Sequence, residues 1–455
     1  MSGFLSNMPP VDLEVDLLDI PVKGRLPRQL NGTLLRIGPN PLFPVEGGHW
    51  FEGDGMVHAF HVADGRVGYQ NRWVRTGRWL AERASGRALP GGLADVAADE
   101  GLANTNIVHH AGRLLALEEA HLPVAMQLDG LATLGSTDFD GAVSDSIAGP
   151  FTAHPKVDPV TGQLLFFGYG TPDWLGAGMR FGVLGADGRV ERFDAFEAPY
   201  ASMVHDFAVT ANYAVFPVQP LTASRERMRA GGPAFAWEAE RACALGVLRR
   251  DAPVDTIAWW SLPACHAYHV MNAWEDGRVL RIDVMQANAA ALFPRPDGTP
   301  VPDAGGSRLS RWSIDLDDRR HEARSELLCE VRGEFPRIDE RRSGLAYRHG
   351  WFVGHDPGDP SRPFSRVVHI DHARPFAPDV HALADGDACS EAVFVPRAPD
   401  AEEGDGWLLA VAYRGASGKS DLLVFDATDV AAGPLASASL PVRVPNGFHG
   451  NWISV

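Results

Sequence analysis

Residues 265–277 read CHAYHVMNAWEDG and contain two histidines, His266 and His269, that lie three positions apart. A histidine that binds a metal should sit on a rigid element among buried residues, with an acceptor near its other ring nitrogen. The apolar neighbours of His269 fit that setting, but the segment alone does not distinguish a metal ligand from a packed imidazole. The chain has 17 histidines, most of which should be structural or solvated. The rest of the sequence must show which of them could act together.

Three further histidines lie in local settings that resemble the setting of His269. His154 lies in GPFTAHPKVDP before a predicted hairpin, His205 lies in the apolar run SMVHDFAVT, and His449 lies in VPNGFHGNW. Successive members of this set are 51, 64 and 180 residues apart, which is neither a helical nor a Cys-x-x-Cys type of spacing. If they form one site, separate strands must deliver each imidazole to a common point. Taken singly, each is more commonly a structural histidine than a ligand.

The elements that could deliver them are short β-strands. Apolar stretches such as GQLLFFGY, NYAVFPV and GWLLAVAY alternate with turn residues along the chain. Asp-Gly tolerates the positive φ of tight hairpin turns, and it occurs at 64–65, 187–188, 276–277 and 405–406. Many short strands at close spacing predict an all-β sandwich, barrel or propeller. No WD-type repeat is visible, so periodicity alone does not select the propeller.

One stretch departs from this pattern. Residues 221–246, LTASRERMRAGGPAFAWEAERACALG, combine helix-forming residues with a Thr/Ser start and a Gly-Gly-Pro stop. They predict an insertion that carries a short helix. No charged or proline-rich linker divides the chain, so residues 1–455 are expected to form a single domain.

Composition narrows the functional classes. The 455 residues are 45% hydrophobic and 22% charged, which is typical of a globular protein with a sizeable core. The four cysteines include no Cys-x-x-Cys pair, which favours a reducing compartment. A net charge of −17 disfavours nucleic acid as a partner. No signal peptide or transmembrane segment is recognisable, so a cytoplasmic location is expected.

Eight blocks, in this order, resemble the carotenoid cleavage oxygenase family, also called the carotenoid/lignostilbene dioxygenases, over nearly the whole chain. They read NGTLLRIGPNP, HWFEGDGMVHAF, ANTNIVHHAGRLLALEEAHLP, FTAHPKVDPVTGQLLFFGY, MVHDFAVTANYAVFP, HVMNAWEDG, GEFPRIDER and VPNGFHGNW. The resemblance implies a seven-bladed β-propeller with short helical insertions and loops capping one face. It also implies one non-haem Fe(II) per chain, held by His154, His205, His269 and His449, with His266 as a neighbour of the site.

The same resemblance implies roles for four more residues. Glu119, Glu275 and Glu334 match the family's carboxylates that accept hydrogen bonds from the ligating histidines, with Glu118 as the rival of Glu119. Such acceptors fix the tautomer of an imidazole and offset metal charge. Thr105 matches a residue whose methyl group restricts access to an open position on the iron. An ordinary strand threonine is the alternative reading of Thr105.

The implied reaction is O2-dependent cleavage of a conjugated C=C bond into two aldehydes or other carbonyl products, without an organic cofactor. Within the family, the chain is most similar to a bacterial branch that acts on aryl-alkenes, which favours a vinylphenol, isoeugenol or stilbenoid substrate. Two departures weaken the stilbene assignment: Glu118 stands where that branch has a lysine, and residues 76–104 contain no tyrosine.

Three alternatives remain open on the sequence. They are apocarotenoid or carotenoid cleavage, a metal-dependent hydrolase or isomerase, and a non-catalytic propeller that binds an apolar ligand. Peripheral membrane contact is expected only if the substrate is a polyene.

Overall fold

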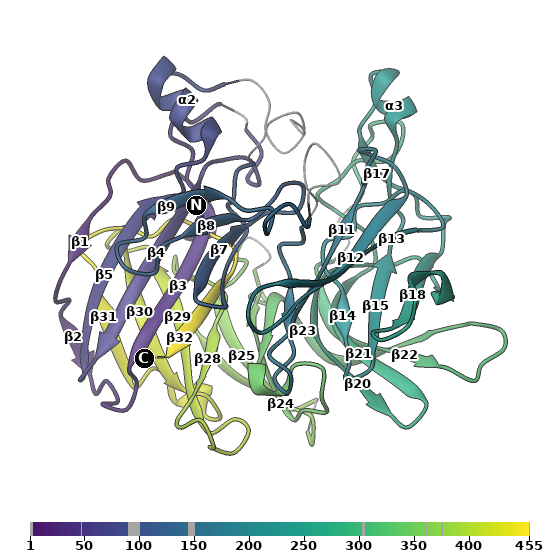
Figure 1. Ribbon diagram of the computed structural model, residues 1–455. Helices are drawn as coiled ribbons and strands as arrows, with labels where there is room; N and C mark the ends of the chain where they lie inside the picture. Colours follow the sequence, from purple (N-terminus) through teal and green to yellow (C-terminus); the bar gives the residue numbers. More distant parts are fainter. Residues whose placement is uncertain are drawn as a thin grey trace. The chain divides into compact units, whose positions relative to one another are not determined.

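The computed structural model describes residues 3–46, 48–89, 101–143, 151–302, 305–359, 362–374 and 376–454. The chain divides into two compact units, which are described separately below. Unit 1 comprises residues 1–138, 337–339 and 348–455, and unit 2 comprises residues 139–336 and 340–347. Figure 1 traces the chain through both units.

Unit 1 contains four antiparallel sheets among the described residues. The first has the order β1 (Asp16–Leu17), β5 (Arg66–Trp73), β4 (Gly55–Ala63), β3 (Gly32–Pro39) and β32 (Gly450–Ser454). The second runs through β6 (Asn106–His110), β7 (Arg113–Leu117), β8 (Val124–Met126) and β9 (Thr133–Ser136). The third consists of β24 (His349–Gly354), β25 (Arg366–Asp371) and β26 (Asp379–Ala382). The fourth has the order β2 (Val22–Gly24), β31 (Ala436–Ser439), β30 (Lys419–Asp426), β29 (Gly406–Arg414) and β27 (Ala388–Cys389), and β28 (Val393–Pro396) also pairs with β29.

Unit 2 contains three such sheets and a small ribbon among the described residues. The first sheet runs through β10 (Lys156–Val157), β11 (Leu164–Tyr169), β12 (Gly178–Leu184) and β13 (Val190–Glu197). The second has the order β14 (Ala208–Val209), β15 (Tyr213–Val218), β18 (Cys243–Arg249) and β19 (Ala258–Leu262). The third runs through β20 (His266–Asp276), β21 (Val279–Ala287), β22 (Arg308–Asp315) and β23 (Arg324–Ile338). The ribbon pairs β16 (Leu221–Ala223) with β17 (Phe235–Trp237).

The two ends of the chain are paired within unit 1. Strand β32 lies antiparallel to β3, with Gly32 opposite Ser454 and Arg36 opposite Gly450. Figure 1 shows them as neighbouring purple and yellow strands. Strand β2 likewise joins β31, with Val22 opposite Ala438. Two sheets of this unit are therefore completed by strands from opposite ends of the sequence.

The sheets of each unit bury apolar side chains between them. In unit 1, one cluster takes Leu34 and Phe60 from the first sheet and Trp407 and Val424 from the fourth. Strand β29 is buried at every position except its last, so both of its faces are covered. Burial of one large apolar side chain contributes about 1.5–3 kcal/mol, so these faces hold neighbouring sheets together.

Hairpin turns follow the sequence prediction at three of the four Asp-Gly pairs. Asp64 and Gly65 have φ of 52° and 78° between β4 and β5. Gly188 and Gly277, with φ of 81° and 63°, turn the chain between β12 and β13 and between β20 and β21. The fourth pair also belongs to a hairpin, that of β28 and β29, but Gly406 is already the first residue of β29 and pairs with Pro396, so the pair closes a longer loop instead of forming a tight turn. The all-β prediction is confirmed, and the series of small antiparallel sheets is the kind that forms propeller blades.

The segment predicted to carry a short helix does contain one, together with short strands. Within 221–246 the helix α3 covers Arg225–Arg229, and the flanking residues form the ribbon of β16 and β17 and the start of β18. Gly231 has a φ of 85°, which favours glycine and ends the helix early. The single-domain assignment of the chain stays a prediction.

The other helices are short as well. They are α1 (Gly3–Ser6), α2 (Gly77–Ser85) and the 3₁₀ turns Val254–Thr256, Glu340–Arg342 and Val430–Ala432. Thr76 caps α2 by accepting a hydrogen bond from the backbone of Trp79, and Gly86 ends it in the left-handed conformation. In the described part of the chain, no helix is long and apolar enough to traverse a lipid bilayer.

Candidate metal centre

The four predicted histidines occupy similar places in four different sheets. His154 precedes β10, His205 precedes β14, and His269 lies in β20. Each of these three strands is the outermost strand at one end of its sheet in unit 2. His449 directly precedes β32, the terminal strand of the first sheet in unit 1. Three of the imidazoles therefore stand just before such a strand, and His269 lies within one.

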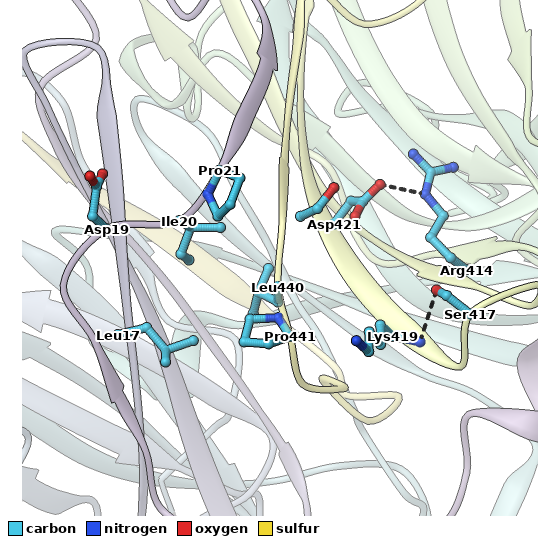
Figure 2. A pocket seen from close by; sticks show the side chains of 11 residues that line it. Leu17, Asp19, Ile20, Pro21, Arg414, Ser417, Lys419, Asp421, Leu440 and Pro441 are labelled. Carbon is cyan, nitrogen blue, oxygen red and sulfur yellow. Dashed lines mark hydrogen bonds and ion pairs between the residues drawn. The ribbon is translucent and has the colours of Figure 1, made fainter.

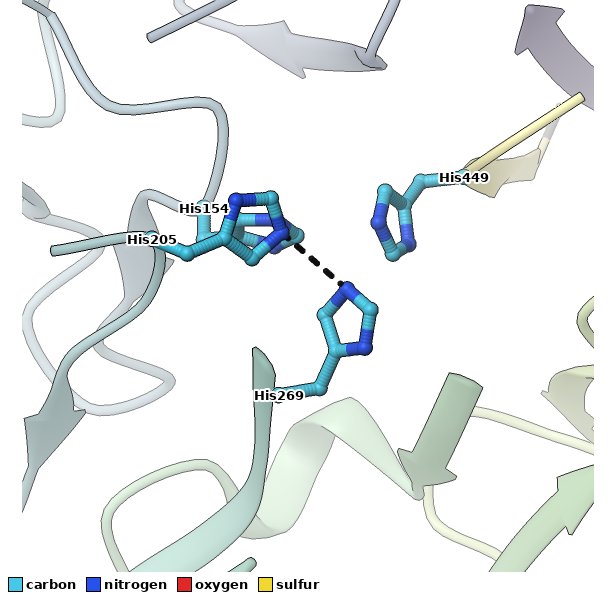
Figure 3. A group of neighbouring side chains, drawn as sticks. All are labelled: His154, His205, His269 and His449. Atoms are coloured by element: carbon cyan, nitrogen blue, oxygen red, sulfur yellow. Dashed lines mark hydrogen bonds between the residues drawn. The ribbon is translucent and has the colours of Figure 1, made fainter. Parts of the chain in front are cut away.

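Three of these histidines converge within unit 2. The Nε2 atom of His205 lies 2.9 Å from Nε2 of His154 and 3.3 Å from Nε2 of His269. The ring centroids are 4.4 to 5.1 Å apart. His154 and His269 are buried and His205 is half-buried. Figure 3 draws these three side chains together with His449.

The spacing of these nitrogens fits a shared metal ion. Imidazole nitrogens bind divalent metals at about 2.0–2.1 Å, so two of them at right angles on one ion are about 3.0 Å apart. The separations of 2.9 and 3.3 Å match that value. On His269, Nδ1 lies 2.6 Å from a carboxylate oxygen of Glu334. When Nδ1–H donates a hydrogen bond to Glu334, the proton of the neutral ring stays on Nδ1. Nε2 then carries a free lone pair, which is what a metal ligand needs.

Glu334 is held in place by two further contacts. Its Oε2 also accepts the backbone N–H of Phe335 at 2.8 Å, and its Oε1 accepts the hydroxyl of Ser307 at 3.2 Å. A carboxylate with three donors is fixed in position, so it fixes the ring of His269 in turn.

Asp206 ties together the three segments that carry these histidines. Its Oδ1 lies 2.7 Å from Nζ of Lys156 and accepts the backbone N–H of Phe207 at 2.8 Å. Its Oδ2 accepts the backbone N–H of Val270 at 2.8 Å. Lys156 follows His154 by two positions, while Asp206 and Val270 directly follow His205 and His269. One buried carboxylate therefore sets the relative positions of three strand ends.

In the described part of the chain, Glu275 makes its hydrogen bonds with Thr210 and Asn212 and with none of the four histidines, which contradicts its sequence assignment. Its Oε1 accepts the hydroxyl of Thr210 at 2.7 Å and the backbone N–H of Asn212 at 2.8 Å. The reason is the geometry of an extended strand, in which six residues span about 20 Å. Glu275 lies six residues beyond His269 on β20 and cannot reach back to its ring.

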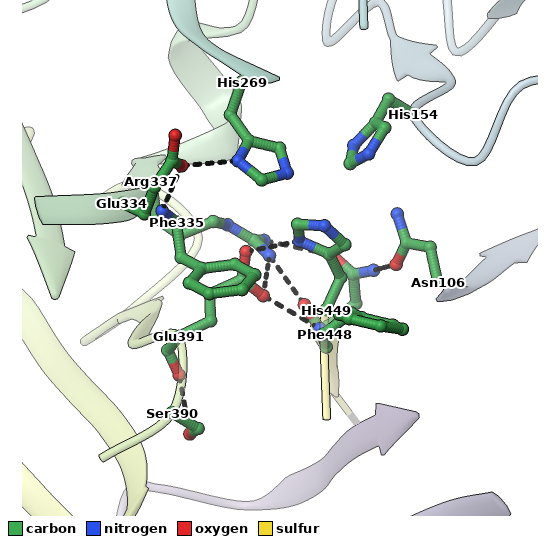
Figure 4. A network of polar contacts seen from close by, with 12 residues as sticks. Asn106, His154, His269, Glu334, Phe335, Arg337, Ser390, Glu391, Phe448 and His449 are labelled. Carbon is green, nitrogen blue, oxygen red and sulfur yellow. Dashed lines mark hydrogen bonds and ion pairs between the residues drawn. The ribbon is translucent and has the colours of Figure 1, made fainter. Parts of the chain in front are cut away.

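The carboxylate that the sequence interpretation missed is Glu391. In unit 1, its Oε1 lies 2.9 Å from Nδ1 of His449, and its Oε2 accepts the backbone N–H of Gly450 at 2.8 Å. Arg337 donates to the same Oε2 at 3.1 Å and to the carbonyl of Gly450 at 2.6 Å. Figure 4 shows this network and the separate contact between Glu334 and His269.

The electrostatic setting keeps Glu391 ionised. Burial alone would raise its pKa, but the charge of Arg337 and the interactions with His449 and the backbone of Gly450 outweigh that effect and lower the pKa to about 2. A signal in the sequence could have identified this residue, because Glu391 is a lone acidic residue in the apolar segment ACSEAVFVP. A buried carboxylate in such a segment requires partners.

The remaining predicted residues lie in unit 1. The hydroxyl of Thr105 donates to Asn104 at 3.0 Å, and its carbonyl accepts the backbone N–H of His449 at 3.2 Å. Glu118 is buried, accepts the backbone N–H of Leu102 at 2.8 Å and pairs with His121. Glu119 is half-buried, and its role stays a prediction. Glu118 is thus engaged by its own loop.

A pocket of about 490 Å³ lies elsewhere in unit 1, at the edge of the fourth sheet. Figure 2 shows its lining, which mixes apolar side chains such as Leu440 with Arg414, Lys419 and Asp421. Arg414 donates to Asp421 at 2.8 Å and to Asp387 at 2.8 Å. No histidine or cysteine lines the pocket, so it offers nothing comparable to the histidine cluster.

Comparisons with known proteins cover almost the entire chain. The RPE65 family, described as retinal pigment epithelial membrane protein, matches residues 8–454. Isoeugenol monooxygenase of Pseudomonas nitroreducens is 37% identical over 468 residues, which cover 98% of this chain and 96% of that protein. Lignostilbene-alpha,beta-dioxygenase isozyme III of Sphingomonas paucimobilis is 36% identical over 482 residues, which cover 99% and 96%. The crystal structure of Pseudomonas brassicacearum lignostilbene dioxygenase matches with a TM-score of 0.93 and 36% identity, covering 99% of this chain and 98% of that one.

Proposed function

The chain belongs to the RPE65 family of carotenoid and lignostilbene oxygenases, and from this premise we propose that it is a non-haem Fe(II) oxygenase that cleaves an aryl-alkene. The observation that carries the proposal is the convergence of three Nε2 atoms in unit 2 at separations suited to one ion. Imidazole ligands suit Fe(II), and a four-imidazole set leaves coordination positions open.

His449 is the proposed fourth ligand. The family resemblance assigns it to the same ion as the three histidines of unit 2. His449 also shares the chemistry of His269, because a buried carboxylate lies against its Nδ1 atom. In both cases that contact leaves Nε2 as the nitrogen to face a metal.

The side chains of the site also determine how the charge of a bound metal ion is offset. The imidazoles of His154, His205, His269 and His449 would bind neutral, so they leave the 2+ charge of Fe(II) unchanged. Glu334 and Glu391 together carry two negative charges close to the ligands and offset it. Bound Fe(II) would supply the activation of O2 for attack on the alkene. The C=C bond breaks and each carbon gains one oxygen atom as a carbonyl, so alkene and O2 balance the two products without a reductant.

The names of the relatives support an aryl-alkene as the substrate. One relative is an isoeugenol monooxygenase and two are lignostilbene dioxygenases. Glu118 is not proposed as a substrate contact, because the backbone of Leu102 and the ring of His121 occupy its carboxylate. A phenolic group on the substrate must therefore be recognised by another side chain.

The test is iron content together with coupled turnover. We expect about one iron per chain, and O2 consumption that matches the appearance of two aldehydes from isoeugenol, 4-vinylguaiacol or a hydroxystilbene. His269→Ala should lose both iron and turnover, because it removes one ligand and leaves Glu334 without its donor. His109→Ala is the matched control, since His109 is exposed on β6 and should retain both. A folded, iron-free wild-type protein, or full turnover in His269→Ala, would contradict the proposal.

A further inference from the structure

Arg337 is a nearly buried arginine that joins two segments of unit 1 around His449. Its side chain is 10% exposed, and that of Glu391, with which it forms an ion pair, is 2% exposed. Its Nη1 lies 3.1 Å from Oε2 of Glu391 and donates to the carbonyl of Gly450 at 2.6 Å, while Nη2 donates to Oδ1 of Asn451 at 3.0 Å. These partners lie 54 to 114 residues further along the sequence. One guanidinium therefore holds together parts of unit 1 that are distant in the chain.

These contacts close a ring of hydrogen bonds beside the imidazole of His449. Glu391 lies 2.9 Å from Nδ1 of His449 and accepts the backbone N–H of Gly450 at 2.8 Å. Gly450 directly follows His449, and its carbonyl returns to Arg337. Figure 4 shows these contacts. Because a guanidinium presents its N–H groups in a rigid planar fork, it can fix two acceptors relative to each other. Arg337 thus holds both the carboxylate that faces the ring and the backbone that carries the ring.

Stability alone does not account for this arginine. The desolvation of two buried charges offsets most of their attraction, so an apolar pair of the same volume is often as stable. Among the described residues, Glu391 has two other donors, His449 and the backbone of Gly450, and both belong to the segment that it has to orient. Arg337 is the donor that comes from a different strand, β23. It supplies a reference point outside that segment.

We propose that Arg337 is a positioning residue, which holds Glu391 against Nδ1 of His449 and so keeps Nε2 of that ring as the ligand nitrogen. This inference rests on the proposed function, because it concerns the same metal centre. The charge of Arg337 by itself has the opposite effect, since a nearby cation repels a divalent ion. The sign of the change in iron affinity on loss of Arg337 therefore separates positioning through Glu391 from a direct effect of charge.

The experiment is a double-mutant cycle in which chelator competition measures iron affinity. Arg337→Met keeps the length of the side chain but removes the charge and the donors, so iron affinity should fall by about 10- to 100-fold. In the background of Glu391→Gln, the same change should cause no further loss, because both residues act through one contact. Unchanged or higher affinity in Arg337→Met, or an equal loss in both backgrounds, would overturn the inference.

Two further variants control for loss of stability. Arg414, also in unit 1, donates to Asp387 and Asp421 at 2.8 Å each. Arg414→Met should unfold at lower urea concentration but bind iron as the wild type does, and an equal loss of iron affinity there would contradict a specific role of Arg337. Arg337→Lys keeps a cation but loses the fork. It should show a smaller loss of affinity than Arg337→Met and replaces it in the cycle if that variant does not fold.

A structural measurement separates this inference from the proposed function. Crystal structures of the metal-free wild type and of metal-free Arg337→Met would give the position of Glu391 in both proteins. We expect Oε1 of Glu391 within hydrogen-bond distance of Nδ1 of His449 in the wild type, and more than about 3.5 Å from it in the variant. If the wild type binds no iron, the proposed function fails while this comparison still decides the role of Arg337. An unmoved Glu391 and His449 in the variant would overturn the inference.

Discussion

Glu334 and Glu391 perform the same task for two different histidines. Each accepts from the Nδ1 side of one imidazole and is itself held by a backbone N–H, from Phe335 and Gly450 respectively. The carboxylates fix ring orientation and tautomer, and they raise the basicity of the opposite nitrogen. The affinity of the site for a metal should therefore depend on residues that do not touch it.

Replacing Glu391 tests this dependence. Glu391→Gln keeps the shape of the side chain but removes the charge, so iron affinity should fall by about 10- to 100-fold. Competition against a chelator at fixed pH measures this change. Glu334→Gln should behave alike, whereas Glu275→Gln, whose side chain contacts Thr210 and Asn212, should bind iron as the wild type does. Equal affinities for all three variants would show that these carboxylates do not tune the site.

At the same scale, the sequence predicted some residues and not others, for a physical reason. The four histidines stand in recognisable apolar segments, and Glu334 lies within the GEFPRID segment that resembles the family. Glu275 was misassigned because the interpretation ignored the length of an extended strand. Glu391 was missed because its contact with His449 joins positions 58 residues apart. Such pairings depend on how sheets stack, which no local pattern records.

Asp206 acts at the scale of elements, because it precedes β14 and links Lys156 at the start of β10 to Val270 within β20. Loss of its charge leaves the partly buried Lys156 without its ion pair and weakens the contact with Val270. We expect Asp206→Asn to lower the free energy of unfolding by about 1–3 kcal/mol. It should also weaken iron binding, since the three histidine-bearing segments lose a common anchor.

The matched control for Asp206→Asn is Asp194→Asn in the same unit. Asp194 pairs with Arg192 at 2.6 Å, but its side chain is 44% exposed, and exposed ion pairs contribute about 0–1 kcal/mol. Urea unfolding and chelator competition on both variants provide the measurements. If the two variants lose stability to the same extent, the contacts of Asp206 contribute no more than an exposed ion pair does.

Turns and helices could be predicted from the sequence where the conformational preferences of a few neighbouring residues determine them. Asp64–Gly65 and Gly277 form turns because their backbone requires a positive φ that glycine and aspartate tolerate. Within 221–246 the short helix forms at Arg225–Arg229, while residues on both sides of it pair as strands. There, the hydrogen bonds available to a neighbouring strand outweighed local propensity.

At the scale of the whole molecule, buried histidines make stability depend on pH. His58, on β4, is 4% exposed and its Nδ1 lies 2.8 Å from the hydroxyl of Tyr69. Burial, followed by the charges of Arg36 and Arg443, lowers the pKa of His58 to about 3. His369, on β25, is buried likewise, and its pKa falls to about 4. Such rings are neutral in the folded protein but take up a proton in the unfolded chain near pH 6.5.

The sign of the effect follows from which state binds more protons. Between pH 6.5 and about 3 the unfolded chain carries a proton on His58 that the folded protein does not, so stability falls as pH falls. The stability that depends on the neutral ring of His58 is fully retained only above pH 6.5. From pH 7.5 to pH 5.5 the expected contribution of His58 is a loss of about 1 kcal/mol.

A variant without the titrating group isolates that contribution. His58→Gln can still hydrogen-bond Tyr69 but has no ionisable ring, so wild type should lose about 1 kcal/mol more than the variant between pH 7.5 and pH 5.5. Urea unfolding of both iron-loaded proteins at the two pH values gives the difference, in which the effects of all other groups cancel. Parallel losses in the two proteins would mean that His58 titrates alike in the folded and unfolded states. Acid sensitivity would then have to come from other buried groups, such as His369 on β25.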